Sequence, residues 1–390
     1  MEKIIIHATV VDNGKAFPNR SIMIRDGKIE AVFPSDDRTA RDFEHEVIDA
    51  QGLLVTPGLI DIHIHGCMGV DAMDADDDAL NTISDFLASH GVTSFYATTI
   101  TQTPENVENA LKSIARQSGR TGGANLLGAH VEGPYINAKH KGAQNPDFLR
   151  IPAPEEYQNW IRKKVVRLIT IAPELEGADE MIRYCRKHEV EVAVGHSGAS
   201  FEQVVHAADL GLSQATHLFN GMQGLHHREP GTVGGALWDS RIFAQVITDG
   251  IHLHPAIVDL IVKIKGIDRT ILISDSIRAC GLSDGKYDLG GQTVNVRNGE
   301  ARIENGSLAG STLTLDQAVR NTMDFTGLDF EVVVAMATAV PARVMKIAGS
   351  KGSIKAGCDA DLAFFDNDFK VAATMINGSI KYQRNKKTGE

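Results

Sequence analysis

The sequence lacks the marks of several protein classes. No apolar run reaches the roughly 20 residues that a membrane-spanning helix needs. No GxGxxG or GxxxxGKS/T stretch follows an apolar run, which argues against a nucleotide-binding fold. Excess positive charge is absent too, because the net charge is −11 at pH 7. A broad surface for nucleic acid or for an anionic membrane is therefore not expected, although a local anion site stays open.

Cysteine is scarce as well. Cys67, Cys185, Cys280 and Cys358 lie far apart and form no CxxC pair, which favours free thiols over a disulfide framework. Cys67 follows His65 by two residues and could be a metal ligand, although a small loop residue is the simpler interpretation. We therefore expect a cytoplasmic protein.

Both ends of the chain contain short apolar runs of the kind found in strands. At 390 residues the chain exceeds the usual size of one domain, roughly 100 to 200 residues. Asp26-Gly27 separates two alternating runs, which is typical of a β-hairpin. The runs at the two ends are 4–6, 21–25, 29–32, 361–365 and 374–380. We predict one small β-sandwich domain formed by residues 1–54 and 350–390.

The middle of the chain, residues 55–349, alternates apolar strands with helical patterns. Candidate strands cover 55–65, 92–100, 125–132, 165–172, 190–196, 213–219, 242–248 and 270–275. Helical patterns cover 105–116, 154–164, 176–188, 200–210 and 255–265, and two more helices are expected within 314–348. This rhythm predicts a (β/α)8 barrel, which typically takes about 250 residues, rather than an open sheet.

Imidazole and carboxylate side chains recur at the ends of these strands. His63 and His65 point the same way, because side chains on a strand alternate with period two. The other strand-end groups are Glu132, His196, His217, Asp249 with His252, and Asp275. Since the carboxyl ends of barrel strands meet at one rim, we expect these groups to gather there.

One carboxylate and two imidazoles, from Glu132, His196 and His217, are typical ligands of a hydrolytic metal centre that leaves a position open for water. His63 and His65 could complete a second site, with Glu132 as the bridge. These residue types suit Zn, Fe, Co and Ni alike, so we expect one or two divalent ions of unnamed identity.

Three further features lie near this rim. Asp275 could take the proton of a metal-activated water and later pass it to a leaving group. The glycine-rich stretch 276–291 that follows is either a moving lid or a plain surface hairpin. His226 to Gly231 forms a basic patch in an acidic chain, and Arg228 within it suits a phosphate or carboxylate. A solvated surface loop is the alternative for this patch.

Taken together, the motifs resemble one family. They are PGLIDIHIHG, HVEGPYIN, GHSGAS, THLFNGM, REPG, TDGIHLHP, ISDS, DGKYDLGGQ and LAGS. In this order, and over nearly the whole chain, they are similar to the N-acetylglucosamine-6-phosphate deacetylases of the amidohydrolase superfamily. The resemblance implies hydrolysis of the N-acetyl group of an amino-sugar 6-phosphate to acetate and the free amine.

The resemblance also implies residue roles. Glu132, His196 and His217 would bind metal, Asp275 would be the catalytic acid and base, and His252 would orient the carbonyl or a sugar hydroxyl. Substrate contacts would come from Ala143, Asn220, Gly221, Arg228, Asp249, Gly250, Ile251, His252, Leu308, Ala309 and Gly310. In this family the phosphate-binding arginine reaches in from a neighbouring subunit, so Arg228 implies a homodimer.

The sequence departs from part of the family at two places. Some members replace the histidine pair of the first strand and use one metal, whereas this chain keeps His63 and His65. Some members also carry a histidine in a KGxHNP-like stretch, where this chain has Gln144, so no role of that histidine is expected here.

Three other functions stay open. An N-acetylgalactosamine-6-phosphate deacetylase would differ in one or two loop contacts. A cyclic amidase or a deaminase of the same superfamily is disfavoured, since cyclic amidases resemble one another in a lysine that ends strand 4, and 165–173 has no terminal lysine. An inactive amino-sugar-phosphate sensor would have no need of Asp275 as a proton carrier.

Overall fold

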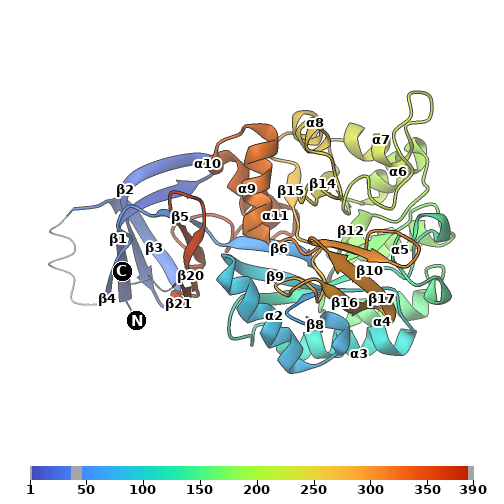
Figure 1. The fold of residues 1–390 in the computed structure, drawn as a ribbon, viewed down its shortest axis with the longest axis horizontal. Coiled ribbons are helices and arrows are strands. Elements are labelled where there is room, and N and C mark those ends of the chain that lie inside the picture. Colours follow the sequence, from blue (N-terminus) through green and yellow to red (C-terminus); the bar gives the residue numbers. More distant parts are fainter. Residues whose placement is uncertain (1, 37–45, 385–390) are drawn as a thin grey trace.

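The computed structural model describes residues 2–36 and 46–384. Parts of the predicted small domain, at residue 1, 37–45 and 385–390, lie outside this description. Within the described chain, the molecule consists of a large α/β part and a smaller β part beside it (Figure 1). No described helix has both the length and the apolar character that crossing a membrane would require.

Eight parallel strands form the centre of the large part and follow one another in chain order. They are β6 (Leu59–Ile64), β9 (Val92–Thr99), β10 (Asn125–Glu132), β11 (Val166–Ile171), β12 (Glu191–Val194), β13 (Gln214–Ala215), β14 (Phe243–Val246) and β15 (Thr270–Leu272). Each lies within one of the predicted strand ranges, and the predicted (β/α)8 barrel is confirmed.

The barrel closes between its first and last strands without a regular ladder in the described residues. Backbone hydrogen bonds join the two sides just beyond the strand ends instead. The amide of Asp275 donates to the carbonyl of His63, and the amide of His65 donates to the carbonyl of Ser276, both at 2.9 Å. The closure therefore runs through residues that the sequence marks as functional.

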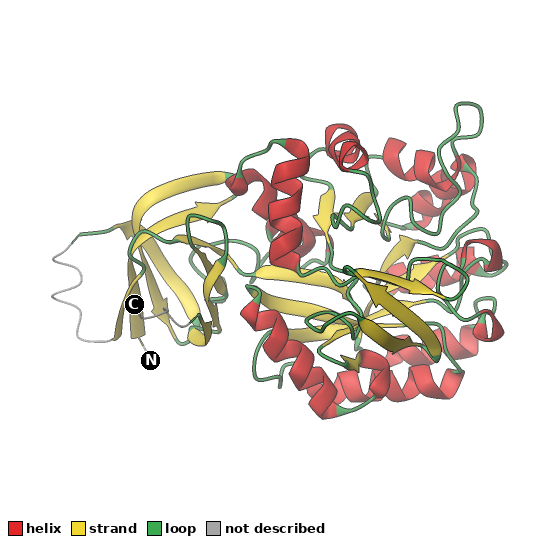
Figure 2. Ribbon diagram, viewed as in Figure 1, coloured by secondary structure: helices red, strands yellow, loops and turns green. Residues whose placement is uncertain are grey.

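Helices cover the outside of the barrel (Figure 2). They are α2 (Asp77–Ser89), α3 (Pro104–Gln117), α4 (Pro154–Arg162), α5 (Ala178–Lys187), α6 (Phe201–Leu210), α7 (Gly231–Trp238), α8 (Pro255–Lys265), α9 (Leu315–Thr326), α10 (Phe330–Val333) and α11 (Ala339–Val344). Short 3₁₀ turns are η1 (Ala72–Asp74), η2 (Ala138–His140), η3 (Pro146–Phe148) and η4 (Val334–Ala337). The five predicted helical patterns between strands correspond to α3, α4, α5, α6 and α8. The two helices expected within 314–348 are a longer α9 followed by three short pieces.

Helices α2 and α7 were not predicted from the sequence pattern. Helix α7 contains three glycines and is buried on almost every side, so it shows neither helix propensity nor an amphipathic stripe. Helix α2 starts in an aspartate-rich stretch whose Asp76 side chain accepts the amide of Asp78 as an N-cap. Carboxylates there are stabilised by the positive end of the helix dipole.

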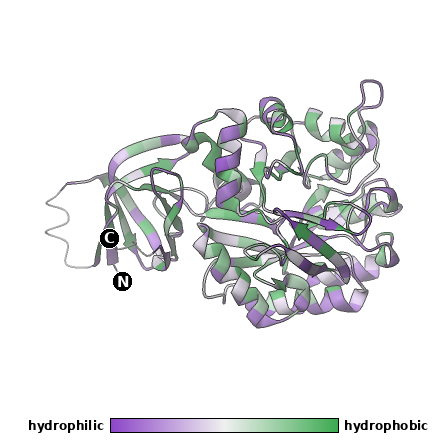
Figure 3. Ribbon diagram, in the orientation of Figure 1, coloured by the Kyte–Doolittle hydropathy of each residue, from purple (hydrophilic) through white to green (hydrophobic). Residues whose placement is uncertain are grey.

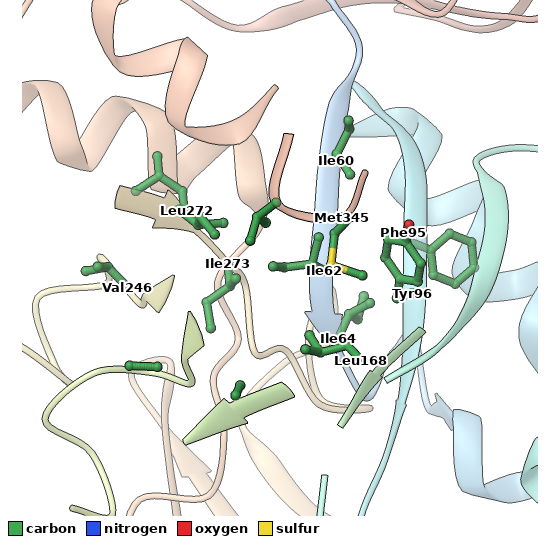
Figure 4. Packing of buried hydrophobic residues seen from close by; sticks show 14 of the residues in the cluster. Ile60, Ile62, Ile64, Phe95, Tyr96, Leu168, Val246, Leu272, Ile273 and Met345 are labelled. Atoms are coloured by element: carbon green, nitrogen blue, oxygen red, sulfur yellow. The ribbon is translucent and has the colours of Figure 1, made fainter. Parts of the chain in front are cut away.

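Apolar side chains fill the space between the strands and the helices (Figure 4). Ile60, Ile62 and Ile64 of β6 are all nearly inaccessible. Figure 3 shows the matching pattern, with hydrophobic residues on the strands and hydrophilic ones toward the outer helix surfaces. The core thus fixes the strand whose end carries the His63-x-His65 pair.

The smaller part is one connected sheet made from both ends of the chain. Its strands are β1 (Glu2–Asp12), β2 (Lys15–Arg25), β3 (Lys28–Pro34), β4 (Glu46–Asp49), β5 (Leu54–Pro57), β19 (Leu362–Phe365), β20 (Val371–Ile376) and β21 (Ser379–Gln383). The predicted Asp26-Gly27 hairpin joins β2 to β3, and both turn residues have positive φ. Strand β1 pairs in parallel with β4 and then with β5, so the sheet wraps around its own apolar core.

The predicted first barrel strand, 55–65, divides at Gly58. Residues before it belong to β5 of the small sheet, and β6 of the barrel begins at Leu59. A Cβ atom on Gly58 would lie 2.0 Å from the Thr93 hydroxyl oxygen, so the crossing requires glycine. The predicted domain boundaries at 54/55 and 349/350 stay predictions.

A small antiparallel sheet follows the last barrel strand. Its strands are β16 (Gly285–Leu289), β17 (Gln292–Arg297) and β18 (Glu300–Ile303), and a short β7 (Gly66–Cys67) and β8 (Val70–Asp71) pair nearby. The stretch 276–291 thus contains half of a hairpin, turning at Gly290 and Gly291. The side-chain amide of Gln292 donates to the carbonyl of Ala143, which ties this hairpin to the strand-end rim. A lid motion of this stretch stays a prediction.

Candidate metal and catalytic site

The predicted metal ligands and the predicted acid/base residue Asp275 meet at the carboxyl end of the barrel. The ligands are His63 in β6, His65 directly after it, Glu132 at the end of β10, His196 after β12 and His217 after β13, and Asp275 follows β15. All six side chains are buried. Their ligand atoms form two groups, each within 4.8 Å: His63 with His65 and Asp275, and Glu132 with His196 and His217. Imidazole and carboxylate groups so arranged fit a divalent metal ion.

Glu132 lies between the two groups. Its Oε1 is 3.0 Å from Nε2 of His217, 3.3 Å from Nε2 of His196 and 3.6 Å from Nε2 of His63. Its Oε2 is 3.4 Å from Nε2 of His65. One carboxylate therefore faces imidazoles of both groups, which is the arrangement that a bridging ligand needs.

Three of these residues adopt a backbone conformation that side chains with a Cβ rarely adopt. The φ angles are 48° at His196, 32° at His217 and 48° at Asp275. The left-handed conformation thus occurs at the very residues whose side chains belong to the two ligand groups. Such local strain persists only where the surrounding structure enforces it, and it concentrates at functional sites.

Burial and charge set the protonation of the site. Burial lowers the pKa of His63 to about 4, so its imidazole is neutral at pH 7, the form that binds metal. Burial alone would raise the pKa of Asp275, but the neighbouring His63, His65 and His217 lower it to about 2. Asp275 is thus a carboxylate near neutral pH and can accept a proton.

Further residues fix the ligands from outside. The ring of His196 contacts the carbonyl of His140 through Nδ1 at 3.0 Å, which directs its Nε2 toward Glu132. The side-chain amide of Gln144 donates to Oε2 of Glu132 at 2.8 Å, and its carbonyl accepts the amide of Thr101 at 2.8 Å. Such outer contacts orient metal ligands and are part of a metal site.

Glu174 is a site residue that the sequence analysis missed. Its Oε1 accepts the Asn137 side-chain amide at 2.9 Å and the Gly198 backbone amide at 2.6 Å, and its Oε2 accepts the Ser197 hydroxyl at 2.7 Å. It thereby joins the loop after β10 to the loop that carries His196. A signal was present, because Glu174 directly follows the strand 4 range at the same rim.

A cavity of 280 Å³ opens above the two ligand groups. Many of the predicted site residues line it: His65, Glu132, Ala143, His196, His217, Asn220, Gly221, His252, Asp275, Leu308 and Gly310. Leu289 of β16 and Ile100 add an apolar wall. The cavity therefore combines polar groups from the strand ends with the hairpin that follows the barrel.

Asp249 lies beside this cavity rather than on its wall. Its carboxylate accepts hydrogen bonds from Nδ1 of His252 at 2.7 Å and from the backbone amides of Ile251 and His252, both at 2.8 Å. Asp249 and Ile251 line a neighbouring cavity of 260 Å³ instead. Gly250, with a φ of 75°, makes the turn between them, and Ala309 is fully buried. Direct substrate contacts of these residues stay predictions.

Arg228 is exposed and does not line the cavity above the ligand groups. Its Nη1 contacts Nε2 of His227 at 2.7 Å, and it lines a separate surface cavity with Glu229. No contact within the described part of the chain brings the guanidinium to the two ligand groups. Cys67 is buried, and among the described residues it belongs to neither ligand group.

A (β/α)8 barrel with histidine and carboxylate ligands at its strand ends is the arrangement of a metal-dependent hydrolase. The chain belongs to the amidohydrolase family, which it matches over residues 54–381.

Within this family it is similar to proteins with one common name. The N-acetylglucosamine-6-phosphate deacetylase of Bacillus subtilis (strain 168) is 36% identical over 385 residues, covering 97% of each chain. The crystal structure of the enzyme of that name from Pasteurella multocida superposes with a TM-score of 0.92 at 28% identity, covering 97% of this chain and 99% of the other. The N-acetylgalactosamine-6-phosphate deacetylase of Escherichia coli O157:H7 is 38% identical over 366 residues, covering 93% of this chain and 94% of that one. The family resemblance expected from the motifs is confirmed.

Proposed function

We propose that the protein hydrolyses the N-acetyl group of N-acetylglucosamine 6-phosphate to glucosamine 6-phosphate and acetate. The observation that carries this proposal is the pair of buried ligand groups beneath a cavity, in a chain that matches deacetylases of that name along almost its entire length. The cavity opens onto residues of both ligand groups, so a substrate bound there would lie beside the proposed metal site.

In this proposal Glu132, His196 and His217 bind one divalent ion. His63, His65 and Asp275 offer ligands for a second, with Glu132 between the two. When bound, such an ion polarises a carbonyl and lowers the pKa of water, which makes hydrolysis possible at neutral pH. We expect Zn, Fe, Co or Ni, because the ligand types accept each of them.

Asp275 performs the proton transfer in this proposal. As water attacks the acetamide carbonyl, the Asp275 carboxylate takes a proton from it. When the C–N bond breaks, the same proton passes to the amine nitrogen, so Asp275 returns to its carboxylate form in each cycle. The place of the Asp275 carboxylate on the cavity wall, beside His63 and His65, supports this role.

His252 orients the carbonyl or a sugar hydroxyl. Its Nδ1 is occupied by Asp249, so Nε2 is the atom available to the cavity. Asn220, Gly221, Ala143, Leu308 and Gly310 line the same cavity and contact the sugar in this proposal.

We further propose a homodimer in which Arg228 binds the 6-phosphate in the neighbouring subunit. Its exposure and its distance from the cavity of its own chain support this arrangement. Leu225 and Trp238 are also exposed, by 54% and 69%, and they offer apolar area for a subunit contact near this loop. Buried free thiols support a cytoplasmic location.

The test is acetate release by protein with a counted metal content. N-acetylglucosamine 6-phosphate, its galactosamine epimer and unphosphorylated N-acetylglucosamine are compared. We expect turnover that depends on the phosphate and is faster with the glucosamine epimer. Preference for the other epimer would move the assignment to the galactosamine enzyme. Absence of turnover with all three substrates would favour the sensor and refute the proposal.

A further inference from the structure

Two fully buried glutamines cross the interior of the barrel beneath the metal ligands. Gln245 of β14 and Gln214 of β13 are both 0% exposed. Nε2 of Gln245 lies 3.0 Å from Oε1 of Gln214, and Oε1 of Gln245 lies 3.4 Å from Nδ1 of His63. Because these amide groups are shielded from water, each needs hydrogen-bond partners inside the barrel.

The chain of side-chain contacts that begins at His63 and runs through Gln245 and Gln214 ends at a methionine. Nε2 of Gln214 lies 3.6 Å from Sδ of Met345, which directly follows α11. Figure 4 shows Met345 beside Ile62 of β6, in the buried packing at the barrel. The contacts thus run from Met345 through Gln214 and Gln245 to His63.

The thioether of Met345 determines which group donates and which accepts in each of these hydrogen bonds. Sulfur in methionine carries no hydrogen and can only accept a hydrogen bond. Gln214 must therefore present its NH₂ group to Met345 and its carbonyl oxygen to Gln245. Gln245 then donates to Gln214 and presents its own carbonyl oxygen to His63. An oxygen at that position can only accept, so Nδ1 of His63 carries the proton.

We propose that Gln245, oriented by Gln214 and Met345, is a positioning residue that fixes the tautomer of His63. With the proton on Nδ1, the lone pair of Nε2 faces Asp275 and His65, where the proposed ion would bind. This inference rests on the proposed metal-dependent function. It also explains two buried amides that would be unfavourable in an apolar barrel interior if they were unpaired.

His65 provides an internal contrast. Its Nδ1 is buried and has no hydrogen-bond partner among the described residues, whereas the same atom of His63 faces Gln245. Of the two histidines of the strand, His63 is thus the one whose tautomer the protein fixes through a side chain.

Two variants separate this role from simple packing. Gln245→Met keeps the length of the side chain but removes the amide oxygen. Gln245→Glu, which burial keeps protonated, retains a carbonyl oxygen that accepts from Nδ1 of His63 and an O–H that donates to Oε1 of Gln214. Loss of outer contacts to metal ligands typically lowers metal affinity about 10-fold to 100-fold. We expect that loss for one Zn²⁺ ion in Gln245→Met, and affinity within about threefold of wild type in Gln245→Glu.

The measurement is Zn²⁺ titration of metal-free protein against a chromophoric chelator, with folding checked by circular dichroism. In parallel, ¹⁵N spectra of metal-free, histidine-labelled protein report the tautomer of His63, assigned by its loss in His63→Gln. Wild-type protein protonated at Nε2 of His63, or Gln245→Met with wild-type Zn²⁺ affinity, would overturn the proposal. Neither experiment uses a sugar, so an inactive enzyme would refute the proposed function and leave this inference standing.

Discussion

Replacing Glu174 by alanine tests whether one carboxylate supports the metal site from outside. The substitution removes hydrogen bonds to Asn137, Ser197 and Gly198. A hydrogen bond to a charged group contributes about 1.5 to 3 kcal/mol when buried. Glu174 is only half-buried, and water replaces part of each bond, so about 1 kcal/mol per bond is a suitable value. We expect the free energy of unfolding to fall by about 3 kcal/mol.

The same substitution should weaken metal binding. The backbone amide of Asn137 donates to the carbonyl of His196 at 2.9 Å, and His140 of the same loop accepts from the His196 ring. Without Glu174 this loop loses its tie to residues 197 and 198. We therefore expect the affinity for the ion at Glu132, His196 and His217 to fall about 10-fold or more.

Glu174→Gln is the matched control. Its carbonyl oxygen can keep the hydrogen bonds from Asn137 and Gly198. Its NH₂ group can donate to the Ser197 hydroxyl, which then accepts a hydrogen bond instead of donating one. Only the charge is lost, which costs about 1 kcal/mol. Urea unfolding gives the stability of both variants, and chelator competition gives their metal affinity. If Glu174→Ala matched wild type in both, the supporting role of this loop contact would be refuted.

Three further predictions use other parts of the molecule. Asp275→Asn should lower kcat about 10²-fold to 10⁴-fold in a protein that still folds and binds metal at Glu132; near-normal turnover would exclude it as the proton carrier. Arg228→Ala should raise KM for the phosphorylated sugar. If Arg228 acts in the neighbouring subunit, mixing this variant with Asp275→Asn should restore about a quarter of wild-type activity after subunit exchange, because half the dimers are mixed and each mixed dimer has one intact site. A mixture no more active than the two variants alone would show that Arg228 does not act across the dimer. Burial would raise the pKa of Asp316, but the hydrogen bond and charge of His90 and the charge of Arg320 lower it from 3.8 to about 2. This carboxylate then contributes about 2 kcal/mol above pH 4, and about half of that is lost as the pH falls to 3; urea unfolding of Asp316→Asn at pH 5 and pH 3 should show a correspondingly smaller acid dependence.

Local patterns predicted most of the barrel because each strand is a short apolar run. They failed where burial removed the pattern, as in α7, whose glycines pack inside the protein on nearly all sides. They predicted the small β domain at the chain ends but not the parallel pairing of β1 with β4 and β5. Parallel pairing between separated segments depends on the tertiary fold and leaves no local turn signal.

The clustering of the candidate metal ligands could be predicted because the barrel topology brings strand ends together, whatever their separation in sequence. Their supporting residues could not. Gln245 and Gln144 are identified only by the contacts of their side-chain amides with His63 and Glu132, and no sequence spacing predicts such contacts. The hydrogen bond of the Asp249 carboxylate to His252, across the turn at Gly250, was likewise not predictable from the motif.

The closure of the barrel has a consequence for how the protein loses function. His63 and Asp275 approach from opposite sides of the junction between β6 and β15, where a few backbone hydrogen bonds replace a ladder. A partial opening at this junction would separate the reactive groups while every helix stayed folded. Catalytic competence would then disappear at lower denaturant concentrations than ellipticity, and amide exchange near residues 63–66 and 275–276 would report the earliest step of inactivation.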